Sequence, residues 1–346
     1  MYFHRAGTGG VVMDGITLTV YQQGIPVQER DTDEVVITHR SSKSGEITIR
    51  TLPDNESISA YKIGSLIVSE PLQDTFIIEK LEITEDTLTA SGHTADIALK
   101  RRVYEKTEIF TGTAKEVLEG LLTSFTGVRA LPIEIQADDG LTQTISFQKT
   151  GATILDVLSA VCEQTGAGYA VEYDTTNGKI IIRVKKEKEN SGVIFSPEYD
   201  NLTNCILQGS IEDFATVAYI AGEGEGQDRA IATAGDTTAT GINRFEVYVD
   251  QRNEKKEASD TAQEYKARLT AKGDEELTKH GFSSAMTGDI LQTEQCVYGT
   301  DYTLGDLVRV ENHDWGVSDT YLVAEVEESQ TASGYSVAPV FAKKGE

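Results

Sequence analysis

The sequence predicts a mainly β protein that also contains a small α+β module and one longer helix. Three observations lead to this fold class. Short segments with alternating apolar and polar residues fill the first hundred positions. Two capped helical segments follow between 105 and 195, and strand-like segments return after a charged helical stretch at 254–282. With 346 residues, the chain exceeds the size at which one core usually stops growing, so we expect several domains.

Residues 1–104 are predicted to form an N-terminal β-domain. The segments there have a period of two and are separated by Gly, Asp, Asn and Ser, which is typical of an antiparallel sandwich or barrel. The predicted strands are 16–27 with a turn at Gly24, 33–40, 45–53, 64–70, 74–84 and 86–94.

Residues 105–195 are predicted to form an α+β module of two short helices against a small sheet. Thr113 and Glu116 form a capping box at the start of the first helix, which Gly127 can end. Thr153 and Asp156 form a similar cap at the start of the second helix, which ends at Gly166. The segments 144–148, 168–174 and 179–186 read as strands, and the last two are joined by the turn at 175–178.

The remaining chain alternates strands with the longest helical stretch. Residues 196–253 are predicted to be a β segment that completes a barrel, 254–282 a helix, and 283–346 a C-terminal β-domain. This order favours a β-domain built from both ends of the chain. The partial apolar stripe of the helix consists of Ala258, Ala262, Tyr265, Leu269 and Leu277.

Composition excludes several classes of protein. The formal net charge of −25 disfavours DNA binding, which depends on cationic side chains. No apolar run reaches the roughly 20 residues of a membrane span, and the first residues lack the apolar region of a secretory signal. The three cysteines, Cys162, Cys205 and Cys296, form no CxxC pair, which favours folding in a reducing cytoplasm and packing roles for Cys162 and Cys205.

Charge is unevenly distributed along the chain. Residues 198–260 hold thirteen acidic and five basic side chains, and 294–346 hold ten acidic and three basic. Cations cluster instead at 100–106 and 179–188. Such segregation fits either solvated faces of opposite sign or complementary contacts between subunits.

No motif predicts a cofactor or metal site. Gly222, Gly224 and Gly226 follow a strand, but no helix follows and two glutamates lie between them, so we expect a loop and not a phosphate site. The acidic pairs Asp31 with Asp33 and Asp138 with Asp139 lack a calcium loop. No zinc-binding spacing occurs among the histidines, which are His4, His39, His93, His280 and His313.

No catalytic residue is predicted either. Ser91, His93 and Asp96 lie close together in sequence, but neighbours along one strand rarely converge as a triad. Paired carboxylates cannot be singled out among 56 acidic residues. We therefore expect a protein without enzymatic activity and without a cofactor.

Several segments resemble tail-hub proteins of siphophages and related prophages. The most specific are YGTDYTLGDLVRV at 298–310, DTYLVAEVEES at 319–329 and the aromatic Phe341 near the end. Leu322 and Val323 stand where an Arg-Ile pair is common in that family. The other matching segments, in family order, are SGHTADIALKRRV (91–103), GATILDVLSAVCEQTGAGYAVEYDTTNGKIIIRV (151–184), VIFSPEYDNLTNCILQGS (193–210), VAYIAGEGEG (217–226) and GINRFEVYVDQR (241–252).

The resemblance implies a structural tail-tip or baseplate hub of a phage or phage-tail-like particle. Such hubs are homotrimers in which two barrel-like β domains per subunit form a pseudo-sixfold ring at the end of the tail tube. The implied partners are the tail tube or distal tail protein on one side and a spike, fibre or tail lysin on the other, without specific nucleic-acid binding. The implied location is the virion tail, after synthesis in the host bacterial cytoplasm. Because the sequence ends with the β-domain, we expect any lytic enzyme to be a separate protein.

Two other functions stay open on the sequence. A tail-associated cell-wall hydrolase would need a cleft with convergent carboxylates or a metal ion. A carbohydrate-binding surface module would need exposed aromatic rings, and Trp315 and Tyr321 are the candidates for stacking on a sugar.

Overall fold

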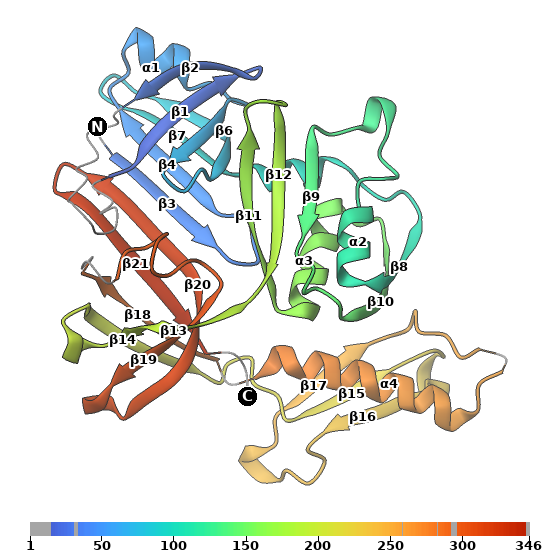
Figure 1. Cartoon of the computed structure of the whole chain (residues 1–346). Helices are drawn as coiled ribbons and strands as arrows, with labels where there is room; N and C mark the ends of the chain where they lie inside the picture. The colour runs from blue at the N-terminus through green and yellow to red at the C-terminus, as the bar shows by residue number, and fades with distance from the viewer. Residues whose placement is uncertain (1–14, 31–33, 258, 282, 292–295, 344–346) are drawn as a thin grey trace. The chain divides into compact units, whose positions relative to one another are not determined.

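The computed structural model describes residues 15–30, 34–257, 259–281, 283–291 and 296–343, and it divides into two compact units (Figure 1). The first unit comprises Met1–Ile206 and Thr287–Phe341, and the second comprises Leu207–Met286 and Ala342–Glu346. The first unit therefore takes strands from both ends of the chain, as the order of the predicted elements indicates.

A thirteen-stranded sheet is the largest element of the structure. Its main path runs β14-β18-β21-β20-β3-β4-β7-β6-β5-β1-β2, with β19 pairing both β20 and β13, and no closing pair is found among the described strands. The strands are β1 Thr17–Gln22, β2 Ile25–Arg30, β3 Glu34–Arg40, β4 Glu46–Thr51, β5 Leu66–Glu70, β6 Thr75–Ile83, β7 Leu88–Thr94, β13 Lys188–Phe195, β14 Leu202–Ser210, β18 Ser283–Ile290, β19 Asp306–Asn312, β20 Val317–Thr331 and β21 Gly334–Ala342.

The N-terminal and C-terminal strands meet where β3 pairs with β20. The pairing is antiparallel and runs from Arg40 opposite Glu325 to Val35 opposite Gln330 (Figure 1). The first half of β20 pairs instead with β19, from Val317 to Leu322. One long strand thus joins the two β regions into a continuous sheet.

Period-two alternation explains the core of these strands. Side chains at alternate positions share one face of a strand, so Val35 and Ile37 on β3 and Ile47 and Ile49 on β4 point into a common core. A separate aromatic contact joins the C-terminal strands, in which Phe195 packs against Tyr302 and Phe341. The short helix α1 (Asn55–Ala60) links β4 to β5.

The α+β module contains two small sheets and two helices. Strands β8 (Thr107–Thr113) and β10 (Thr144–Thr150) pair with each other, and β11 (Ala167–Asp174), β12 (Lys179–Lys186) and β9 (Ile133–Ala137) form the second sheet in that order. Helices α2 (Ala114–Gly120) and α3 (Ile154–Thr165) begin with the predicted capping boxes, and α3 ends at Gly166 as predicted.

The first helix of the module is shorter than predicted. It ends at Gly120 and not near Gly127, because the Thr123 hydroxyl and amide both donate to the Gly120 carbonyl. Such side-chain bonds compete with the helical pattern. Leu121 and Phe125 are nevertheless buried, since tight turns continue the chain along the same apolar face.

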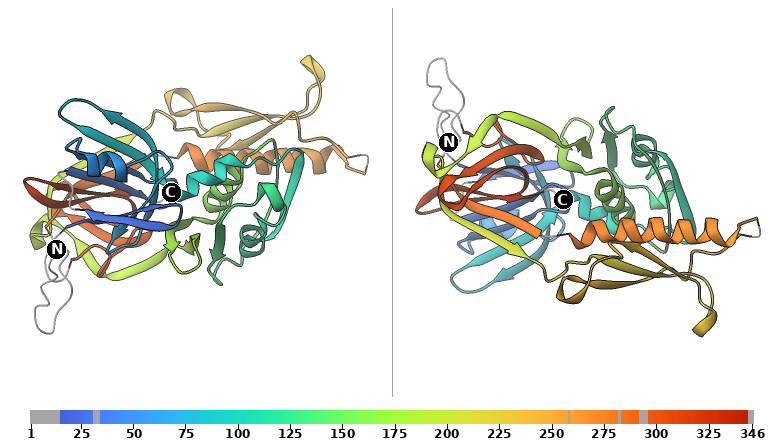
Figure 2. Two further views of the ribbon diagram at one scale, coloured as in Figure 1. Left: turned by 90° about the horizontal axis from the view of Figure 1, so that it is seen from above. Right: turned by 90° about the horizontal axis from the view of Figure 1, so that it is seen from below.

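The second unit packs one helix on a three-stranded sheet (Figure 2). The strand order is β16 (Ile231–Gly235), β15 (Val217–Ala221) and β17 (Glu246–Asp250), and α4 spans Ala262–Leu277. Among the described strands, these three pair only with one another. The prediction that 196–253 completes a barrel stays a prediction, as do the other domain boundaries.

The long helix begins later than predicted, at Ala262 and not near 254. Thr261 caps it in a third capping box with Glu264. Residues 254–257 and 259–260 are not helical, and Arg268 on α4 binds the carboxylates of Glu254 and Asp260. Ala258 of the predicted stripe lies outside the described residues. Short 3-10 helices occupy Ala95–Arg101 (η1), Gly127–Arg129 (η2), Pro197–Tyr199 (η3), Gly226–Asp228 (η4), Gly241–Asn243 (η5), Thr278–His280 (η6) and His313–Trp315 (η7).

Candidate functional site

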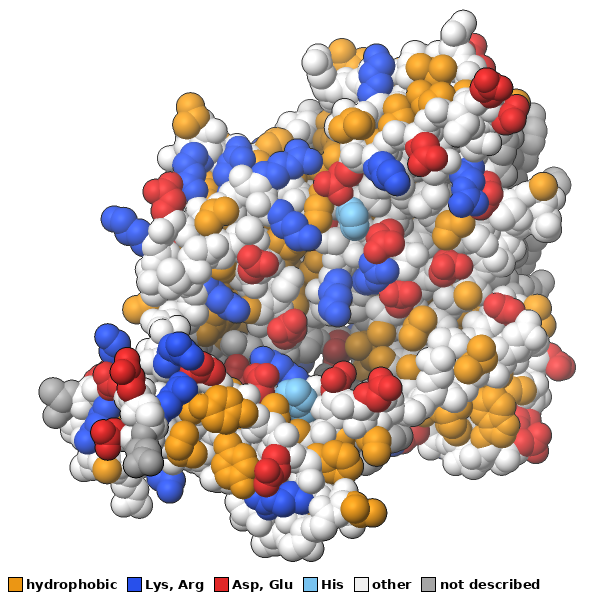
Figure 3. Space-filling model, turned by 180° about the vertical axis from the view of Figure 1, so that it is seen from behind, with side chains coloured by type: hydrophobic (Ala, Val, Ile, Leu, Met, Phe, Trp, Pro, Cys, Tyr) orange, Lys and Arg blue, Asp and Glu red, His pale blue; other side chains and the backbone are white. Residues whose placement is uncertain are grey.

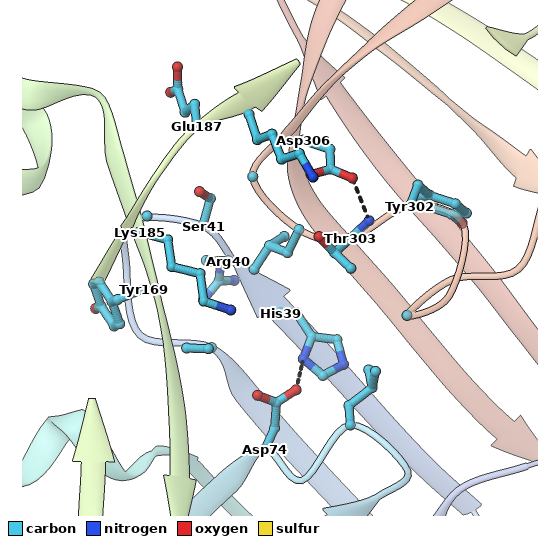
Figure 4. A pocket seen from close by; sticks show the side chains of 18 of the residues that line it. His39, Arg40, Ser41, Asp74, Tyr169, Lys185, Glu187, Tyr302, Thr303 and Asp306 are labelled. Atoms are coloured by element: carbon cyan, nitrogen blue, oxygen red, sulfur yellow. Dashed lines mark hydrogen bonds and ion pairs between the residues drawn. The ribbon is translucent and has the colours of Figure 1, made fainter. Parts of the chain in front are cut away.

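A cleft of about 530 Å³ lies in the first unit, where three parts of the chain meet (Figure 4). One wall is the end of β3 with the turn after it, at 39–45. The second wall consists of β11 residues 168–172 and of residues 185–188 and 190, where β12 passes into β13. The third wall is the loop 298–305 with the first residue of β19. A cleft of this size accommodates a small ligand or a few residues of peptide.

A buried histidine between two carboxylates lies at the base of this cleft. The Nδ1 atom of His39 is 3.0 Å from Asp74 Oδ2, and its Nε2 atom is 2.6 Å from Glu328 Oε2. His39 and Glu328 are 4% and 3% exposed, so the pair is shielded from water. The Tyr335 hydroxyl donates to the other oxygen of Glu328, and the Tyr298 ring lies 5.9 Å from the imidazole.

These contacts keep His39 protonated. Burial alone would lower the pKa of His39, but the charges and hydrogen bonds of Asp74 and Glu328 outweigh it and raise the pKa to about 10. Both ring nitrogens therefore donate, one to each carboxylate. Burial also raises the pKa of the Tyr335 and Tyr298 hydroxyls, with the Glu328 charge adding to the effect.

Strand alternation accounts for the position of His39. On β3, Val35, Ile37 and His39 occupy the inward positions, and on β20 Val326 and Glu328 are both buried. Asp74 arrives from the turn between β5 and β6, where its carbonyl accepts from the Ser69 amide. The charged side chains of His39, Asp74 and Glu328 are tolerated inside the sheet because each contacts a side chain of opposite charge.

A second buried carboxylate, Asp96, lies beside the same cleft. It accepts hydrogen bonds from the hydroxyls of Ser44 at 2.7 Å, Thr94 at 2.5 Å and Tyr169 at 2.8 Å. Burial raises the pKa of Asp96, and the three hydrogen bonds oppose that rise. Since Tyr169 lies on β11 and Asp96 on η1, this cluster ties the α+β module to the N-terminal strands.

The cleft is lined by charges of both signs, with carboxylates that include Asp301 and Asp306 beside four lysines. Lys43, Lys185, Lys186 and Lys188 line it, and all four side chains are exposed. None of them forms an ion pair with any residue that the structure describes. Figure 4 shows Lys185 extending into the cleft from β12. Lys185, Lys186 and Lys188 belong to the cationic stretch at 179–188, and Lys43 lies in the turn after β3.

The structure separates the three residues that lie together at 91–96. Ser91 and His93 share the outer face of β7, where His93 Nδ1 lies 2.7 Å from Glu79 Oε2. Asp96 points inward and is fully buried. The three side chains therefore do not converge on one site.

The glycine-rich segment forms a strand-end loop, as predicted. After β15, the chain turns through Gly222, Gly224 and Gly226 into η4 and returns antiparallel as β16. A side chain at Gly222 would meet the Tyr265 hydroxyl at 2.3 Å, so glycine is needed there for packing against α4.

The aromatic pair considered for sugar stacking is not available as a pair. Trp315 is 48% exposed, but Tyr321 is only 3% exposed within β20. A buried ring offers no face to a sugar, so this expectation is wrong for Tyr321.

Other candidate groups are dispersed. Within the described part of the chain, no group of three or more His, Cys, Asp or Glu could hold a metal ion, and the cysteines are free. His4, Asp31 and Asp33 lie outside the described residues. Asp138 Oδ1 accepts from the Gly140 amide in a turn. Among the described helices, none has the length and apolar character needed to cross a membrane.

Comparison with known proteins identifies the family. The family of Siphovirus ReqiPepy6 Gp37-like proteins matches residues 22–342, nearly the whole chain, and the chain belongs to this family. No curated protein sequence matches the chain.

Solved structures show the same fold. The 43 kDa tail protein of prophage MuSo2 from Shewanella oneidensis aligns with a TM-score of 0.63 at 17% identity, covering 95% of this chain and 98% of that one. A tail protein from Neisseria meningitidis aligns with a TM-score of 0.62 at 14% identity over 95% and 97%. Prophage tail protein gp18 from Listeria monocytogenes gives 0.54 at 11% identity over 94% of each chain. The predicted resemblance to phage tail proteins is confirmed at the level of family and fold.

Proposed function

We infer that this protein is a structural hub of a phage-type tail. In this proposal three copies form a ring that caps the tail tube and connects it to a spike, fibre or lysin. The observation that carries the proposal is the match to prophage tail proteins over 95% of the chain, together with family membership across residues 22–342. The location would be the virion tail, and the role would depend on assembly and not on catalysis.

Electrostatics supports a conduit role. A ring of three copies would carry three times the net charge of −25. A strongly anionic channel repels a passing genome instead of binding it. Basic and acidic side chains are interspersed on the face seen in Figure 3, so no broad cationic surface for a nucleic acid is visible there.

The mass of the protein in solution and in assembled particles tests this proposal. We expect a threefold mass in solution by native mass spectrometry, and a threefold ring with an open channel at the tail tip by electron cryomicroscopy. A single copy in both measurements would overturn the ring. Cleavage of peptidoglycan by the purified chain would favour a tail-associated hydrolase instead, and glycan binding by an isolated monomer would favour a carbohydrate-binding module.

A further inference from the structure

We propose that the second unit binds a neutral oligosaccharide on the face of its sheet that lies opposite α4. This open face carries Tyr219, Tyr248, Ile231 and Thr233, and sugar rings would stack on the two tyrosines. The proposal goes beyond the hub function and does not depend on the ring. Tyr248 is 60% and Ile231 45% exposed, so the face is accessible to a ligand.

Strand alternation separates the two faces of this sheet. Ile220 on β15 packs with Leu269 of α4, so the neighbouring Tyr219 points to the opposite side. The pairing register places Tyr219 directly beside Tyr248 of β17 and Thr233 of β16. Figure 3 shows apolar side chains gathered on the second unit, on the side of the molecule that faces the viewer there.

Hydrogen bonds hold the two tyrosine rings along the sheet. The Tyr219 hydroxyl donates to Glu246 Oε1 at 3.1 Å and accepts from Arg244 Nη2 at 2.9 Å. Since Glu246 lies two residues before Tyr248 on the same face of β17, the Tyr219 ring extends along the strand direction. The Tyr248 hydroxyl accepts from Arg229 Nη1 at 3.1 Å. Rings that are already held in place lose little conformational entropy when a ligand binds.

The charged side chains around the rings are paired with one another. Arg229 and Arg252 both bind the carboxylate of Asp250, and Arg244 binds that of Glu246. A charged ligand therefore finds no unpaired group of opposite sign among them. Glu246 Oε2 has no hydrogen-bond partner among the described residues, so it can accept from a ligand hydroxyl. This arrangement favours a neutral ligand that carries hydroxyl groups.

The open face is too small for a stable protein partner. Its three strands have five residues each, so the face measures about 17 Å by about 14 Å, or roughly 240 Å². A stable protein interface covers about 800 Å² on each partner. A short oligosaccharide fits the smaller area, and the C–H face of a sugar ring packs on the electron-rich face of a tyrosine.

Titration of the full chain with cellohexaose and with chitohexaose tests the site by calorimetry. Tyr248→Ala should weaken binding at least tenfold, because the more exposed of the two rings is lost. Tyr248→Phe keeps that ring and should stay within about threefold of the wild type. Tyr199→Ala is the matched control, since Tyr199 is 56% exposed in the first unit, and it should stay within about twofold. Thermal unfolding verifies that each variant is folded.

Several outcomes would overturn the site. They are absence of binding of both hexamers at about 10 mM, equal losses in Tyr248→Ala and Tyr199→Ala, and a loss in Tyr248→Phe as large as in Tyr248→Ala. Tighter binding of a heparin hexasaccharide would overturn the neutral class of ligand. The mass measurements separate this site from the hub. Binding by a chain that forms a threefold ring supports both, whereas binding by a chain that stays a single copy in solution and in particles supports the site and overturns the ring.

Discussion

His39 and Glu328 are in direct contact, with 2.6 Å between the imidazole Nε2 and the carboxylate Oε2, although 289 residues separate them in the chain. The contact lies where β3 pairs with β20, the junction of the N-terminal and C-terminal strands. Asp74 completes the arrangement from the turn between β5 and β6. One buried imidazolium thus links three segments that lie far apart in the sequence.

Replacing Glu328 with glutamine should destabilise the first unit by about 2–4 kcal/mol. The substitution removes one of two charges that compensate a buried cation, and losing a partner from a buried pair is costly. Urea unfolding at pH 6.5 measures the effect. Glu327→Gln is the control, because the neighbouring side chain is exposed, and it should change the free energy of unfolding by less than about 0.5 kcal/mol. Similar losses in both variants would contradict the role assigned to the buried pair.

Stability should fall as the pH rises above 6.5. The pKa of His39 is raised from 6.5 to about 10 in the folded protein, so its contribution is complete below pH 6.5 and is lost progressively up to about pH 10. Unfolding measured at pH 6.5, 7.5 and 8.5 should show this decline, and His39→Gln should remove that part of the slope. Ring nitrogen shifts in NMR spectra should show His39 still protonated at pH 8. Titration of His39 near 6.5 would refute the prediction.

Two substitutions of Asp96 should lower the free energy of unfolding to different extents. Asp96→Leu leaves the hydroxyls of Ser44, Thr94 and Tyr169 without their buried acceptor, and each lost acceptor costs about 1–3 kcal/mol. Asp96→Asn keeps one acceptor oxygen and should cost less. Asp314→Leu, at an exposed site, is the control for the change of residue type. Chemical denaturation gives the three values, and a smaller loss for leucine than for asparagine would contradict the hydrogen-bond scheme.

Local chemistry made part of this fold predictable. The capping boxes at Thr113 and Thr153 involve atoms within four residues of each other, so the sequence pattern alone specifies them. The end of α2 was less predictable, because the apolar spacing continues to Phe125 while the backbone has already left the helix at Gly120. The apolar periodicity indicates which side chains are buried. It is the same for a helix and for turns that extend the helix along one face, so it does not locate the end of α2.

The cleft and its buried charges could not be predicted in the same way. Nothing in the segment around His39 distinguishes it from an ordinary strand residue, because its partners depend on the pairing of β3 with β20. The lysines at 179–188 were visible as a cationic cluster, but the sequence left open whether they face solvent or a subunit. Only the fold places them on the rim of a cleft.

Replacing two helical glycines, Gly273 and Gly120, by alanine should have different effects on stability. Helix propensity alone favours alanine by up to about 1 kcal/mol at either position. At Gly273 on α4, the added Cβ would lie 2.3 Å from Ile220 Cδ1 and 2.7 Å from Ala234 Cβ, so the helix would have to move off its sheet. Such overpacking typically costs about 1–3 kcal/mol, and we expect a net loss.

Gly120 on α2 provides the matched control, since a Cβ there meets nothing within 4 Å. Gly120→Ala should leave stability unchanged or raise it by up to about 1 kcal/mol, whereas Gly273→Ala should lower the protection of α4. Hydrogen exchange followed by mass spectrometry resolves the two helices separately. Because the second unit depends on one helix against three strands, the loss at Gly273 should be concentrated in α4 and in β15, which carries Ile220. Unchanged exchange in these two elements would show that the close approach of α4 to the sheet is not tight.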